Sequence, residues 1–134
     1  MALSPTEMYA HVLRNDFYAF VHRAFLELNP GKEFVPSWYI EVLAAKLEEV
    51  RRGTCKRLIV NMPPRMLKTH VVSICFSAWL LGHNRCLQIM SITYAQDLSD
   101  SFARKVRALM NSPFYQAIFS TRVLWLQREP ARSS

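Results

Sequence analysis

The hydrophobic pattern of the chain changes character near Gly53. Before that point, apolar residues recur every three or four positions, which is the spacing of an amphipathic helix. A first helix is expected to begin at Ser4, a good capping residue, and to stop at the Asn-Pro-Gly sequence of residues 29–31. A second helix is expected over residues 36–50, with Gly53 placed to end it. The first part of the chain is therefore predicted to be helical.

After Gly53 the pattern alternates between β-rich runs and helical periods. Residues 58–60 and 86–93 are predicted to be buried strands, and residues 123–126 to begin a third. Helices are expected at 69–81, 95–110 and 113–119. Strands that alternate with helices imply a parallel sheet with right-handed crossovers. The predicted fold class is α/β, with a partial parallel sheet, flanking helices and two preceding N-terminal helices.

This change of pattern divides the chain into three predicted parts. Residues 1–53 form an N-terminal helical segment, residues 54–127 a partial α/β domain and residues 128–134 an unstructured tail. The longest apolar run, at 71–82, is too short to span a membrane, and no signal peptide precedes it. A soluble intracellular protein with no membrane association is expected.

Composition narrows the class of protein further. The chain has 134 residues, of which 51% are hydrophobic and 12% aromatic, which excludes a disordered tail. Its three cysteines are odd in number and contain no closely spaced pair, and the four histidines add no metal-ligand pattern. Neither a disulfide framework nor a zinc site is predicted.

The charge is distributed unevenly. The net charge is +7, and no acidic residue lies between Glu49 and Asp97, a stretch that holds seven Lys and Arg residues. A block of one sign favours an anionic partner such as a nucleotide or a nucleic acid. A solvated face, with its compensating acids elsewhere in a longer parent chain, explains the same block, and both interpretations stay open.

The segment 62–69, Met-Pro-Pro-Arg-Met-Leu-Lys-Thr, lies between a predicted strand and a predicted helix, where a phosphate-binding loop is found. Lys68 has the right type and place to reach β- and γ-phosphates, and Thr69 to hold Mg²⁺. Met62 and Leu67 replace the two glycines of that motif. A left-handed conformation at Leu67 would cost roughly 1–2 kcal/mol. The competing interpretation is a proline turn with a solvated lysine.

Several separated pieces of the sequence resemble one protein family in the same order. They are RLIVNMPPRMLKTH at the loop, a helix ending in WLLG, a β-rich run ending in Tyr94 and the later segment SPFYQAIF. Together, over about residues 36–120, they resemble the N-terminal ATPase region of the large terminase subunit of tailed bacteriophages.

The resemblance implies a P-loop motor that hydrolyses ATP with Mg²⁺ to translocate double-stranded DNA. It also implies the phage portal and the small terminase subunit as partners, and the cytoplasm of a bacterial host as the location. The residues that it assigns to nucleotide binding are Pro64, Arg65, Met66, Leu67, Lys68, Thr69 and Tyr39.

Individual roles follow from the same resemblance. Thr69 would coordinate the metal, and Arg65 would act catalytically on the γ-phosphate, unless it is only a surface charge. Trp38 and Tyr39 lie where the family often has an aromatic–His pair ahead of the loop. That position suggests Tyr39 beside adenine, whereas core packing is the expected role of Trp38.

The sequence lacks the second acidic motif of a hydrolytic P-loop enzyme. After the loop the acids are Asp97, Asp100 and Glu129, and none follows a run of four apolar residues. The chain is therefore predicted to be an N-terminal terminase fragment that binds ATP but does not hydrolyse it alone, and enzyme activity is left open.

The alternative is a non-enzymatic prophage remnant or a basic module that binds DNA or protein. Arg104, Lys105 and Arg107 form a basic cluster on the predicted 95–110 helix, which suits either DNA contact or a solvated face.

Overall fold

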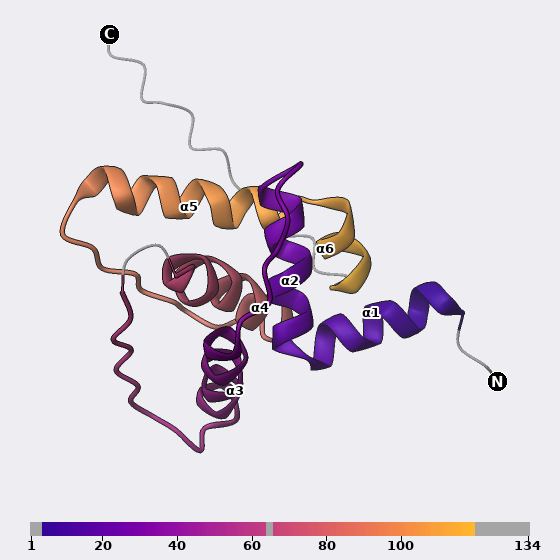
Figure 1. Cartoon of the computed structure of the whole chain (residues 1–134), viewed down its shortest axis with the longest axis horizontal. Coiled ribbons are helices and arrows are strands. Elements are labelled where there is room, and N and C mark those ends of the chain that lie inside the picture. Colours follow the sequence, from indigo (N-terminus) through magenta and orange to yellow (C-terminus); the bar gives the residue numbers. More distant parts are fainter. Residues whose placement is uncertain (1–3, 64–65, 120–134) are drawn as a thin grey trace, which may run out of the picture.

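The structure is a computed structural model that describes residues 4–63 and 66–119. Of these residues 66% are helical, and none lies in a β-strand. Figure 1 shows the helices gathered around α2, with α5 crossing one end of the molecule and α1 projecting from the side. No helix in the described ranges is long and apolar enough to cross a membrane.

The N-terminal part forms three helices, α1 (Pro5–Asn15), α2 (Phe17–Leu28) and α3 (Trp38–Arg52). The single helix predicted before residue 29 is therefore wrong in one respect, because it is broken at Asp16. The Asp16 backbone is extended (φ −115°, ψ 105°), and its carboxylate accepts hydrogen bonds from the backbone N–H groups of the next helix. An aspartate with this geometry starts a new helix by capping it.

The predicted ends of the helices at 4 and 53 are confirmed. Ser4 and Glu7 form a reciprocal capping box at the start of α1. Gly53 follows α3 in the left-handed conformation (φ 83°), and its N–H donates to the carbonyls of Glu49 and Val50. A glycine adopts this conformation without the steric cost that a side chain would add.

The second half of the described chain is helical as well. It contains the π-helix η1 (His70–Cys75), which continues directly into α4 (Phe76–His83), and then α5 (Gln96–Met110) and α6 (Pro113–Ile118). Helices were predicted at these three places, and they are present. The π-helical turn at the start of the first of them was not predicted.

The predicted parallel sheet is wrong. Residues 58–60 and 86–93 form no strand and no ladder with each other or with any other described residue. Ile59 is 87% exposed, and Met90 and Ile92 are each 84% exposed. The third predicted strand, 123–126, lies outside the described residues.

The physical reason for this correction is that a β-rich run records only local side-chain preference. A strand also needs a neighbouring strand to pair its backbone groups. Figure 1 shows residues 54–63 as a loop at the outer edge of the molecule, and neither run is paired with a strand in the described chain. The P-loop NTPase fold class is overturned with the sheet.

One hydrophobic core joins the two halves of the chain. Its centre is α2, which contacts α1, α3, η1, α4 and α5. The Phe20 ring lies 6.0–6.3 Å, between centroids, from the rings of Phe114, Tyr115 and Phe119. Two buried hydrogen bonds fix the orientation of aromatic side chains in this core. Trp79 Nε1 donates to the Leu13 carbonyl at 3.3 Å, and the Tyr115 hydroxyl donates to the Ala78 carbonyl at 2.7 Å.

Candidate functional site

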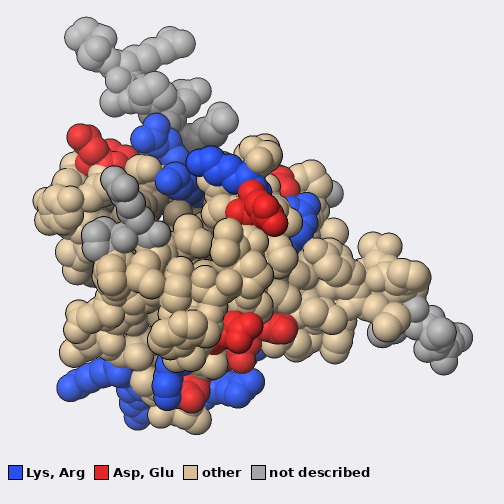
Figure 2. Space-filling view, in the orientation of Figure 1, with Lys and Arg blue, Asp and Glu red and all other residues tan. Residues whose placement is uncertain are grey.

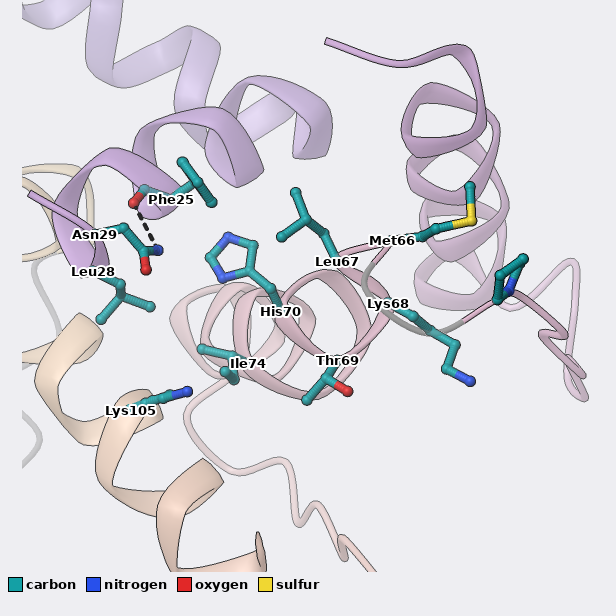
Figure 3. Close-up of a pocket in the computed structure, with 11 residues that line it drawn as sticks. Phe25, Leu28, Asn29, Met66, Leu67, Lys68, Thr69, His70, Ile74 and Lys105 are labelled. Atoms are coloured by element: carbon teal, nitrogen blue, oxygen red, sulfur yellow. Dashed lines mark hydrogen bonds between the residues drawn. The ribbon is translucent and has the colours of Figure 1, made fainter. Parts of the chain in front are cut away.

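A cavity of about 510 Å³ lies where the end of α2, loop residues 63 and 66–69, the start of η1 and one side of α5 meet (Figure 3). Its lining combines apolar side chains with two lysines, a threonine, an asparagine and a histidine. The lining residues are Phe25, Leu28, Asn29, Pro63, Met66, Leu67, Lys68, Thr69, His70, Ile74 and Lys105. The loop singled out by the sequence thus forms one wall of a cavity of ligand size.

The backbone at Leu67 turns in the left-handed conformation, with φ at 60°. Among the described residues it is the only non-glycine residue with a positive φ. Its carbonyl accepts a hydrogen bond from Val71 N–H at 2.9 Å, so the turn leads straight into the helix. The half-buried Leu67 side chain packs against the core. A leucine therefore holds the kind of turn for which a phosphate-binding loop ordinarily uses glycine.

Lys68 and Thr69 follow this turn as the first helical residues, and both side chains are exposed. The start of a helix carries free N–H groups and a partial positive charge, which favours anions. Figure 3 shows the Thr69 hydroxyl directed away from the helix, and the Lys68 side chain extending toward the loop side, away from His70 and Lys105. The two residues predicted to bind phosphate and metal thus border the same cavity.

Lys105 reaches this cavity from α5, a position that the sequence did not indicate. The predicted basic cluster does not act as one patch, because its three members face different surroundings. Arg104 donates to the Asp100 carbonyl, whereas Arg107 donates to the Ala103 carbonyl and lines a separate cavity. Only the tertiary packing of α5 against η1 and α2 brings Lys105 to the loop.

His70 closes the floor of the cavity beside Cys75. The imidazole Nε2 lies 3.3 Å from the Cys75 Sγ. Burial lowers the pKa of His70, a backbone hydrogen bond to Val21 raises it and the nearby Lys105 charge lowers it, and together they set this pKa at about 4. Burial also raises the pKa of the Cys75 thiol well above its ordinary value. Both groups are therefore uncharged near pH 7, and the pair forms a structural wall rather than an activated nucleophile.

Of the other predicted site residues, one lines the cavity, two lie away from it and two fall outside the described residues. Met66 lines the cavity, whereas Pro64 and Arg65 fall outside the described residues. Tyr39 is half-buried against the core and does not line the cavity. Trp38 is 77% exposed, so its expected core packing is wrong, and Ile40 instead turns inward from the first turn of α3. Trp38 and Tyr39 are both apolar aromatic residues, so hydrophobicity alone could not predict which of them is buried and which is exposed.

The cavity fits phosphate better than it fits a bare metal ion. Of the residues that line it, two carry positive charge and none is a carboxylate. No group of three or more potential metal ligands occurs within the described ranges. Mg²⁺ is usually held by one or two carboxylates together with substrate phosphates. At this site Mg²⁺ would arrive with the phosphates, and Thr69 is the hydroxyl that could join its ligands.

Comparisons with protein families, curated proteins and solved structures found no match to this chain.

Proposed function

We propose that the chain binds ATP through its phosphates at the 62–69 loop, as the nucleotide-binding part of a phage DNA-packaging terminase. The observation that supports this best is the left-handed turn at Leu67, which presents Lys68 and Thr69 at the start of a helix and at the edge of the cavity. The ordered resemblance over about residues 36–120 supports the terminase part of the proposal. If the chain belongs to a terminase, its partners are double-stranded DNA, a portal protein and a small terminase subunit.

The chemistry of binding does not require a sheet. The Lys68 ammonium group supplies charge, the free N–H groups at the start of the helix supply hydrogen-bond donors, and the Thr69 hydroxyl can meet the metal that accompanies the phosphates. No carboxylate lines the described cavity to take a proton from an attacking water. The isolated chain is therefore proposed to hold ATP without hydrolysing it.

A titration with a fluorescent ATP analogue and Mg²⁺ tests this function. Saturable binding is expected for the native chain, and Lys68→Ala should weaken it by about tenfold or more, because a charge-assisted hydrogen bond is lost. Lys56→Ala is the matched control, since Lys56 is an exposed lysine of the same basic stretch that does not line the cavity. Absent binding, or equal affinity in the Lys68 variant, would contradict the proposal that this loop binds ATP. Mg²⁺-dependent ATP turnover by the pure chain would contradict the proposal that the chain does not hydrolyse ATP.

The basic block between Glu49 and Asp97 favours a second candidate, a non-enzymatic module that binds DNA. Figure 2 shows basic and acidic side chains intermixed at two ends of the face in view, with a broad uncharged region between them. That face offers no continuous basic track for a phosphate backbone. Salt-sensitive binding of duplex DNA that is unchanged by Lys68→Ala and by ATP would favour this module over the nucleotide site.

A further inference from the structure

We propose that Lys105 is a second phosphate-binding residue, and that the cavity takes a chain of two or three phosphates rather than a single phosphate. The inference rests on the proposed function and names the ligand class of the same site. It assigns a role to a residue of α5 that neither the loop motif nor the resemblance includes.

The first argument is the placement of two cations from different elements around one cavity. Lys68 comes from the loop and Lys105 from α5, and both line the 510 Å³ space. The α5 helix packs against both η1 and α2, so its distance from the loop is set by the hydrophobic core. The fold, and not a flexible tail, therefore places the two lysines at one cavity.

The second argument is charge. The ion pairs of the described residues join Arg23 with Glu27, Lys46 with Glu49 and Arg52 with Glu48, so neither cavity lysine has a carboxylate partner in them. None of the described residues that line the cavity is acidic, and the lowered pKa of His70 leaves it uncharged near pH 7. Two positive charges at one cavity without an acidic lining make the potential there positive, which favours an anionic ligand.

The third argument is the direction of the side chains. Figure 3 shows Lys105 on the α5 side of Thr69 and Lys68 on the loop side, with the Lys68 side chain extending away from Lys105, so the two charges lie at opposite ends of the cavity. A linear polyphosphate can place one phosphate near each lysine while it passes the hydroxyl. A single phosphate that contacts Lys68 does not also contact Lys105. The number of linked phosphates in the ligand therefore determines whether it contacts one lysine or both.

Calorimetric titration of the full chain with inorganic phosphate, pyrophosphate and tripolyphosphate tests the inference. The native chain should bind more tightly as the phosphate chain lengthens. Lys105→Gln should weaken tripolyphosphate binding by about tenfold while changing inorganic phosphate binding less than twofold. Lys68→Gln should weaken all three ligands. Arg104→Gln, which removes a neighbouring charge of α5 that does not line the cavity, should leave all three unchanged.

The possible results separate this inference from the function on which it rests. If Lys68→Gln weakens binding but Lys105→Gln matches the native chain for every ligand, Lys105 has no part in the site and the inference is wrong. The inference is equally wrong if Arg104→Gln is as harmful as Lys105→Gln, because general charge then explains the effect. If no ligand binds the native chain, or binding ignores Lys68, the proposed function itself fails.

Discussion

At the scale of single residues, Leu67 has the least ordinary backbone of the described chain. Its φ of 60° places Cβ close to the following carbonyl oxygen, a contact that costs an L-residue roughly 1–2 kcal/mol. The side chain offsets part of that cost by packing against the core. Strain and burial thus oppose each other at one position, next to the two residues proposed to bind phosphate.

A pair of substitutions separates these two contributions. Leu67→Ala and Leu67→Gly both remove the packed side chain, but only glycine relieves the left-handed strain. The glycine variant should be more stable than the alanine variant by about 1 kcal/mol, the reverse of the order at positions with a negative φ. Urea unfolding followed by circular dichroism measures the difference. An alanine variant as stable as the glycine variant would show that position 67 is not left-handed.

At the scale of elements, the π-helical turn η1 places His70 and Cys75 in contact beside the cavity. The Phe76 N–H donates to the Val71 carbonyl five residues earlier, and the wider turn brings His70 and Cys75 into contact across the same five-residue interval. His70 thereby becomes buried beneath the loop. Its lowered pKa is a consequence of this local geometry and of burial, and it couples the folding of η1 to pH.

The sign of that coupling follows from the pKa values. The folded-state pKa of His70 is about 4, below the ordinary 6.5, so between these values the unfolded chain takes up a proton that the folded chain excludes. This contribution to stability is complete above about pH 6.5 and is lost as the pH falls toward 4, by up to about 3 kcal/mol. Urea unfolding from pH 7 to 4.5 should show the loss.

His70→Gln is the control for this prediction. The glutamine variant should lose less stability over the same pH range, because the group that titrates has been removed. His83, whose pKa is also lowered, first by burial and then by Arg51, contributes to both proteins and cancels in the comparison. Parallel pH profiles of the native chain and the variant would refute the assignment to His70.

At the scale of the whole molecule, the described helices share one core instead of forming separate bodies. Phe20 illustrates this, because a residue of the N-terminal segment is fully buried against three aromatic rings from α6 and its C-terminal edge. The Arg14 guanidinium also reaches across to the Ile118 carbonyl at 3.2 Å. Cooperative folding of residues before and after Gly53 follows from contacts of this kind.

Phe20→Ala should therefore destabilise the entire described chain, by about 3–5 kcal/mol, because it opens a cavity in the shared core. Tyr9→Ala, the removal of an exposed aromatic ring from α1, should change the free energy of unfolding by less than about 0.5 kcal/mol. Circular dichroism and tryptophan fluorescence should report one coincident transition. Two separate transitions would mean that the segments before and after Gly53 fold independently.

Local sequence determined most of the helices and several of their ends. Ser4 with Glu7, and Gly53, act through neighbours a few residues away, so their capping roles could be predicted from the sequence alone. The helix predicted from Thr69 onward followed from its local apolar pattern, and in the structure Lys68 and Thr69 are its first residues. For Leu67 the sequence indicated only the cost of a left-handed backbone, and it did not predict that the residue adopts one.

Tertiary structure decided the sheet and the composition of the cavity. The β-rich runs at 58–60 and 86–93 have suitable side chains, but pairing depends on a neighbour that the sequence pattern does not specify, and the described helices supply none. Lys105 is one of three neighbouring basic positions on α5, and only the packing of that helix selects it to line the same cavity as Lys68 and Thr69. Helix propensity and capping are local properties of the chain, whereas strand pairing and the meeting of distant side chains depend on how its elements pack.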